Sequence, residues 1–89
     1  MPQVCVPPPY QGPTRGLAEI EVRGKTVREC IDAVGSRFPG FRDQIFDPEG
    51  KVHGFVQLFV NGDEIGRSAL DTPVDAGDRI EILAAIAGG

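Results

Sequence analysis

GFVQLFVNGDEI, residues 54–65, carries the clearest structural signal in the chain. Its Asn61-Gly62 pair can supply the two positive φ angles of a type I′ turn, and such a pair between two apolar runs indicates a β-hairpin. Because side chains alternate between the two faces of a strand, we expect every second residue from Val56 to Val60 to face the core. The residues expected to face outward are Phe55, Gln57 and Phe59.

Two short strands are predicted before this hairpin. Residues 3–7, QVCVP, alternate apolar and small or polar side chains, and the prolines that follow cannot donate to a ladder and so end the strand. Residues 18–24, AEIEVRG, alternate strictly between apolar and charged side chains, which is typical of a half-buried strand. Residues 8–17 are rich in turn formers and are expected to be the loop of an antiparallel hairpin.

A helix is predicted within residues 25–40, KTVRECIDAVGSRFPG. Thr26 and Glu29 have the spacing of a capping box, in which the hydroxyl accepts from the Glu29 amide and the carboxylate reaches back to Thr26. Pro39-Gly40 is expected to end the helix. One apolar face recurs at three- and four-residue spacing, and its members are Val27, Cys30, Ile31, Val34 and Phe38.

The last strand is predicted in residues 79–87, RIEILAAIA, after a turn at 75–78. Ile80 and Ile82 have the core phase, whereas Leu83 has the exposed phase. A short or irregular helical segment near Phe41–Phe46 and a connection through 66–78 complete the order. We therefore expect an α+β fold of the β-grasp type, with the last strand between the first and the third and parallel to the first. The predicted parts are a domain at 1–83 and a flexible tail at 84–89.

The composition excludes several classes of protein. Eighty-nine residues make one small domain, and a net charge of −4 argues against binding to nucleic acid. No apolar run is long enough for a membrane span, and the N-terminus lacks the features of a secretory signal, so we expect a cytoplasmic protein. Residues 43–89 contain three Lys/Arg and nine Asp/Glu. This acidic half is either a solvated surface or a docking surface for a basic partner.

No catalytic or metal-binding residues are predicted. The two cysteines, Cys5 and Cys30, are too few for a disulfide scaffold, and we expect both to be reduced, with Cys30 in the core. His53 is the only histidine and is expected to be a solvated loop residue. Without a nucleophile–base pair or a Cys/His cluster, neither an enzyme nor a bound cofactor is expected.

The last four residues follow a predicted strand and have mostly minimal side chains, which makes them a candidate functional segment. They are Ile86, Ala87, Gly88 and Gly89. Glycine lacks a Cβ, so such a segment can run through a narrow channel and leaves a terminal carboxylate open to attack from either side. We expect the Gly89 carboxylate to be the working group, presented to the active site of another protein. Ordering four such residues costs on the order of 4–8 kcal/mol, so a second contact is needed. Candidates for this partner-binding patch are Phe59, Leu83 and Phe55, which are large, apolar and in the outward phase.

Three stretches of the sequence carry a family resemblance, namely FVQLFVNGDEI, LDTPVDAGDRIEILAAIAGG and the final Gly88-Gly89. Together they resemble the ubiquitin-like sulfur-carrier family, which contains the thiamin carrier ThiS and the molybdopterin synthase subunit MoaD. GKVHGFVQLFVNG, residues 50–62, looks most like the branch that serves cysteine and secondary-metabolite biosynthesis. The sequence departs from the family at Ala84, where many members have proline.

The resemblance implies a carrier rather than an enzyme. An E1-like activating enzyme would use ATP to adenylate Gly89, a sulfur donor (sulfide or a persulfide sulfurtransferase) would convert it to a thiocarboxylate, and a synthase would accept the sulfur into a metabolite. Gly88, Ala87 and Ile86 would be the spacer. Three alternatives stay open, namely a ubiquitin-like modifier joined to lysines through Gly89, a protein that acts both as carrier and as modifier, and a β-grasp interaction module that undergoes no covalent chemistry.

Overall fold

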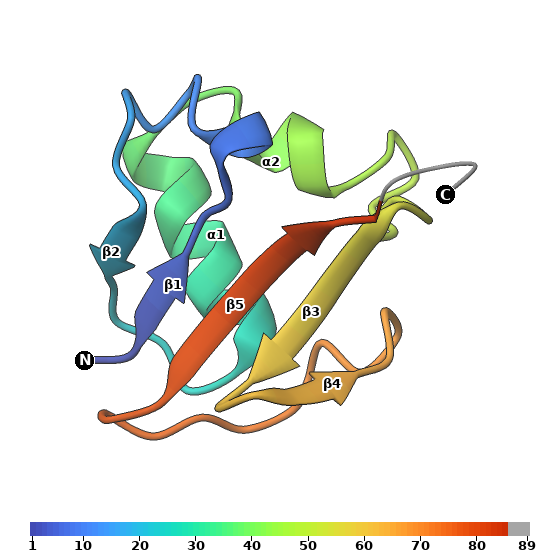
Figure 1. Cartoon of the computed structure of the whole chain (residues 1–89). Coiled ribbons are helices and arrows are strands. Elements are labelled where there is room, and N and C mark those ends of the chain that lie inside the picture. The colour runs from blue at the N-terminus through green and yellow to red at the C-terminus, as the bar shows by residue number, and fades with distance from the viewer. Residues whose placement is uncertain (86–89) are drawn as a thin grey trace.

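Residues 1–85 are described by the computed structural model, and five strands among them form one mixed sheet in the order β2-β1-β5-β3-β4 (Figure 1). The central strand, β5, is parallel to β1 and antiparallel to β3, while β1–β2 and β3–β4 are antiparallel pairs. The predicted β-grasp arrangement is therefore confirmed. In chain order the elements are β1 (Gln3–Cys5), the 3₁₀ helix η1 (Pro8–Tyr10), β2 (Glu19–Glu21), α1 (Val27–Arg37), α2 (Phe41–Ile45), β3 (Val56–Val60), β4 (Asp63–Ile65) and β5 (Arg79–Ala84).

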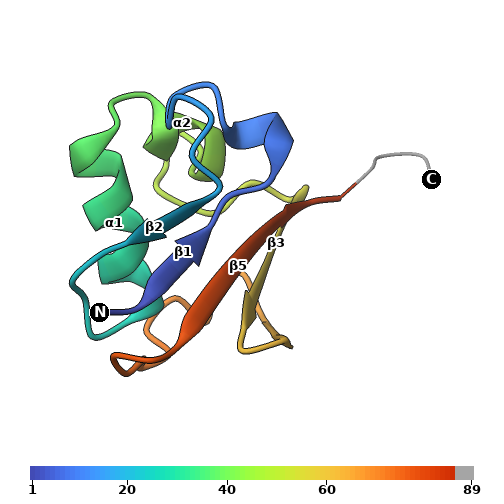
Figure 2. The same ribbon diagram turned by 60° about the vertical axis from the view of Figure 1, so that its left-hand side comes forward.

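The hydrophobic core lies between α1 and one face of the sheet. Figure 2 shows both helices on that face and leaves the other face of the sheet open. Burial of apolar side chains on one face only is what the strand and helix periodicities predict. The predicted apolar face of α1 is buried at Val27, Cys30, Ile31 and Val34, and the sheet contributes Val4, Val56, Leu58, Ile80 and Ile82.

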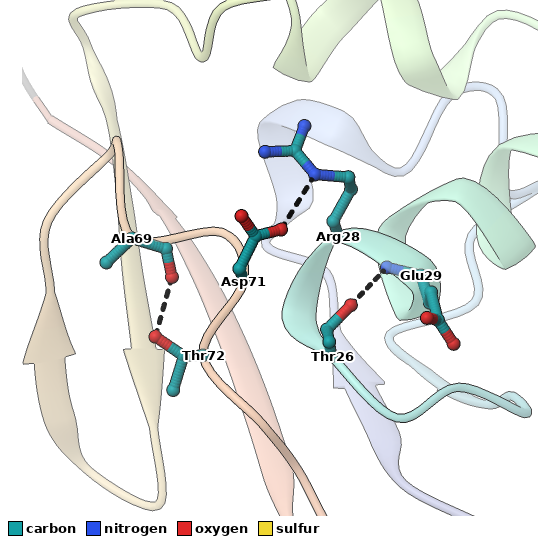
Figure 3. Close-up of polar contacts among 6 residues, drawn as sticks. All are labelled: Thr26, Arg28, Glu29, Ala69, Asp71 and Thr72. Atoms are coloured by element: carbon teal, nitrogen blue, oxygen red, sulfur yellow. Dashed lines mark hydrogen bonds and ion pairs between the residues drawn. The ribbon is translucent and has the colours of Figure 1, made fainter.

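One of the two hydrogen bonds predicted for the N-terminal cap of α1 forms, and the other has a different partner. The hydroxyl oxygen of Thr26 accepts a hydrogen bond from the amide of Glu29 at 3.2 Å (Figure 3). The Glu29 carboxylate, however, accepts from the amide of Lys25 at 3.1 Å rather than from Thr26. Thr26 itself forms a β-bridge with Pro73, and this pairing sets the path of the chain just before the helix.

The Asn61-Gly62 turn forms as predicted, with φ angles of 52° and 88°. Val56 and Leu58 are fully buried, but Val60 is only half-buried because it lies at the end of β3 beside the turn. The Asn61 side chain also reaches the segment before β5, since its Nδ2 donates to the Asp78 carboxylate at 3.0 Å. The hairpin is therefore tied to the start of the central strand.

The loop predicted at 8–17 is more ordered than the sequence indicates. It contains η1 and buries Tyr10 and Thr14, and the Thr14 hydroxyl donates to the carbonyl of Leu17 at 3.0 Å. Downstream of α1, the predicted short helical segment is α2, and its residues Phe41 and Ile45 are buried. Both segments complete the core at the end of the sheet where β5 finishes (Figure 1).

Candidate partner interface at the end of β5

The end of β5 is held to β3 by the last interactions that the structure describes. Ala84 pairs with Val56, and the amide of Ala85 donates to the carbonyl of Phe55 at 2.6 Å. This pairing extends into the range 84–89, so the domain boundary placed after residue 83 stays a prediction. The spacer and acceptor residues predicted from the sequence lie outside the described residues, and they are Ile86, Ala87, Gly88 and Gly89.

The open face of the sheet carries one continuous row of side chains across all five strands. The strand registers align Glu19 with Cys5, Cys5 with Glu81, Glu81 with Phe59, and Phe59 with Glu64. Directly opposed residues in neighbouring strands have Cβ atoms about 5 Å apart, so these side chains are immediate neighbours. The row therefore places three carboxylates and one aromatic ring on the surface that no helix covers.

The predicted patch of Phe59, Leu83 and Phe55 lies on or beside this face, with unequal exposure. Leu83 is 42% exposed and Phe55 is 47% exposed, whereas Phe59 is half-buried and therefore less accessible than either. Leu83 is opposite Gln57, one register step from the Glu81–Phe59 pair, so Leu83 and Phe59 are diagonal neighbours. The patch is thus a strip beside carboxylates, and a partner that combines apolar and basic groups fits it.

Phe55 lies beside the end of β5, and its ring packs against the ring of His53. The two rings stack with centroids 5.0 Å apart and planes 10° from parallel. The His53 amide also donates to the carbonyl of Ile45 at 2.9 Å, and its Nε2 lies 3.3 Å from the carbonyl oxygen of Asp43. The expectation of a solvated histidine is therefore inaccurate, since His53 is half-buried and props up the exposed ring of Phe55.

A hollow of about 410 Å³ lies beside Leu83, over β1 and β5. The half-buried Cys5 and the exposed Arg79 and Glu19 are among its lining residues, and Arg79 forms an ion pair with Glu19 at 3.7 Å. Burial raises the pKa of the Cys5 thiol, and the nearby Arg79 opposes this only in part. Because a thiol rather than a thiolate is a poor nucleophile, this environment gives Cys5 no reactive character. The sequence contains no signal for the hollow, which depends on how η1 packs beside the sheet.

Both cysteines are free, and Cys30 is buried in the core as predicted. Among residues 1–85 there is no cluster of three or more His, Cys, Asp or Glu side chains that could bind a metal ion. Within the same part of the chain, neither helix has the length and apolar composition needed to cross a membrane.

Comparison with known proteins gives consistent relationships over almost the whole chain. The model of the ThiS family matches residues 10–89. The sulfur carrier protein CysO of Mycobacterium tuberculosis is 32% identical over 89 residues, which cover 97% of this chain and 96% of the relative. A chain of the crystal structure of the Amycolatopsis orientalis BexX/CysO complex superposes with a TM-score of 0.88 and 35% identity, with both chains fully covered. SAMP1 of Haloferax volcanii shares the fold, with a TM-score of 0.79, 19% identity and coverage of 99% and 98%.

Proposed function

The chain belongs to the ThiS family, and we propose that it is a sulfur carrier protein that bears its sulfur on the carboxyl carbon of Gly89. The observation that carries this proposal is the extent of the family match, which runs to Gly88-Gly89. The similarity to CysO over 97% of the chain supports the same role. In this role the protein is a substrate of other enzymes and is not itself a catalyst.

The chemistry follows from the properties of a carboxylate. Its negative charge repels nucleophiles and its leaving group would be oxide, so it must first be activated. An adenylating partner would join the Gly89 carboxylate to the α-phosphate of ATP and release pyrophosphate. Sulfide would then attack the acyl carbon, form the C–S bond and expel AMP, leaving a thiocarboxylate. A persulfide donor would give an acyl disulfide instead, and a thiol reductant would be needed to free the thiocarboxylate.

The folded domain would supply recognition, and the partners would supply catalysis. The strip of Phe59, Leu83 and Phe55 begins where β5 ends, so one partner could hold this strip and receive the following residues in its active site. The similar CysO of Amycolatopsis orientalis was crystallised in complex with BexX, which is consistent with a carrier that works through protein partners. The partners we propose are an E1-like adenylating enzyme, a sulfur donor and a sulfur-accepting synthase.

The test is incubation of the full chain with a cognate adenylating enzyme and ATP, with and without sulfide. We expect pyrophosphate release in both cases and a thiocarboxylate only when sulfide is present. Adducts on lysines of other proteins, without any thiocarboxylate, would favour a ubiquitin-like modifier instead. Absence of pyrophosphate release with an enzyme that adenylates a related carrier would contradict both covalent roles.

A further inference from the structure

A second concave surface lies at the β4 edge of the sheet, away from β1 and the hollow beside Leu83. This groove, of about 930 Å³, is bounded by the loop before β3 at residues 50–52 and the loop after β4 at residues 66–68. Figure 1 shows the backbone of β3 and β4, which these loops adjoin. Arg67 joins the two loops, because its Nη1 donates to the carbonyl of Gly54 at 3.1 Å. The apolar side chains in the lining are Val52, Val56, Ile65 and Leu70.

The charged lining of this groove has the opposite sign to the protein as a whole. Its lining contains three cations, Arg28, Lys51 and Arg67, and one carboxylate, that of Glu64. The chain carries a net charge of −4, so this concentration of positive charge is local. It is also assembled from three separate elements, namely α1 and the two loops.

Most of this positive charge is unneutralised. In the described residues, neither Lys51 nor Arg67 has an ion-pair partner. Arg28 contacts Asp71 through Nε at 3.2 Å, and Figure 3 shows its two terminal nitrogens pointing away from that carboxylate. The pair is largely exposed, with side-chain accessibilities of 43% and 85%, so solvent screens it strongly. The terminal nitrogens of Arg28 thus remain available to an anionic ligand.

The groove also contains an accessible apolar side chain. Ile65, at the end of β4, is half-buried, whereas Val56 is 0% exposed and Val52 and Leu70 are buried. Apolar contact with a ligand in this groove would therefore be made mainly by Ile65.

We propose that this groove binds an extended acidic segment of a partner protein. An apolar side chain of the segment would cover the half-buried Ile65, and its carboxylates would lie against Arg28, Lys51 and Arg67. Clusters of basic side chains commonly recognise acidic peptide segments in this way. This role goes beyond sulfur carriage, because it needs none of residues 86–89. The basic groove would bind an acidic partner, whereas the acidic open face would bind a basic one.

The test uses a capped peptide that alternates glutamate with valine, titrated into the ¹⁵N-labelled full chain. We expect the largest amide shifts at Gln57, Ile65 and Gly66. Lys51→Glu, which removes a cation whose side chain makes no hydrogen bond or ion pair among residues 1–85, should weaken binding about tenfold, because it removes an attraction and adds a repulsion. Arg23→Glu is the matched control, since Arg23 is exposed and lies outside the groove, and it should change the affinity less than twofold.

Three outcomes would overturn the proposal. The first is an equal loss of affinity in Arg23→Glu and Lys51→Glu, which would indicate non-specific attraction. The second is a set of shifts confined to the open face around Phe59 and Glu81. The third is inorganic phosphate producing the same shifts at the same affinity, which would indicate a small-anion site. A chain lacking Gly88 and Gly89 should bind the peptide unchanged, so this proposal and the proposed sulfur chemistry can fail independently.

Discussion

The amide of Ala85 donates to the carbonyl of Phe55 at 2.6 Å, and this is the last hydrogen bond along the chain that the structure describes. It holds the end of the central strand beside an exposed aromatic ring that is 47% accessible. The residue that precedes the proposed spacer is therefore placed at the edge of the proposed partner-binding strip. The last described residue of the chain and the proposed partner-binding strip are therefore adjacent.

Proline substitutions at two adjacent positions test the role of this hydrogen bond. Ala85→Pro removes the amide that donates to Phe55, and a lost hydrogen bond of this kind costs about 0.5–1.5 kcal/mol. Ala84 pairs with Val56 at a position where its amide points away from β3, so Ala84→Pro is the control. Hydrogen exchange should accelerate at Gln57 and Leu83 in Ala85→Pro only. Equal acceleration in both variants would show that the bond does not hold the end of β5.

The N-cap of α1 gives a prediction about stability. Thr26→Ala removes the oxygen that accepts from the Glu29 amide, and we expect a loss of about 1 kcal/mol in the free energy of unfolding. Thr26→Ser keeps that oxygen and should retain most of the stability. Denaturant unfolding measures both values, and a Thr26→Ala protein as stable as Thr26→Ser would mean that the β-bridge to Pro73 alone positions the helix start.

The turn before β5 gives a prediction about pH. A hydrogen bond from the Asp75 amide, followed by one from the Asn61 side chain, lowers the pKa of Asp78 below its ordinary value of 3.8. The folded state therefore favours the charged carboxylate, and its stabilising contribution is present above pH 3.8 and is lost as the pH falls through the lower folded pKa. Asp78→Asn should lower the Tm at neutral pH, and the difference from the unmodified protein should shrink as the pH falls below 3.8.

Asp63→Asn is the control for that experiment, because among residues 1–85 the Asp63 side chain has no hydrogen bond or ion pair. Its Tm should follow that of the unmodified protein across the same range. A constant difference between Asp78→Asn and the unmodified protein at every pH would show that shape rather than charge matters at this turn.

The partner-binding strip is tested by Phe59→Asp. A carboxylate at this position, between Glu81 and Glu64, would replace apolar contact with a cluster of like charges. We expect the affinity for the adenylating enzyme to fall at least about tenfold, which corresponds to about 1.4 kcal/mol. Ser36→Asp adds the same charge on the exposed side of α1 and should leave the affinity unchanged. Circular dichroism of both variants checks that the fold is retained, and an unaltered affinity in Phe59→Asp would remove Phe59 from the interface.

Local signals in the sequence predict most of the fold. The positive φ angles of Asn61-Gly62, the hydroxyl of Thr26 and the alternating phase of Ile80 and Ile82 each depend on a few neighbouring residues, and all three predictions are confirmed. The partner of the Glu29 carboxylate was predicted wrongly, since the carboxylate accepts from the Lys25 amide one residue before the N-cap.

The two concave surfaces illustrate what a single sequence does not reveal. The basic groove requires Arg28 on a helix to meet Lys51 and Arg67 on two loops. None of these residues is unusual in its own segment. Their chemistry arises from tertiary packing, whereas the significance of Gly88-Gly89 comes from sequence resemblance and the family match.

The central claim is that Gly89 is the residue that carries sulfur, and intact-mass analysis tests it most directly. The full chain is incubated with ATP, sulfide and a cognate adenylating enzyme, beside a chain that lacks Gly89. We predict that the full chain gains the mass difference between one sulfur and one oxygen, that the gain maps to Gly89 in the C-terminal peptide, and that the shortened chain gains nothing while its Tm is unchanged. The same gain in the shortened chain, or none in the full chain despite an enzyme active on a related carrier, would contradict the account.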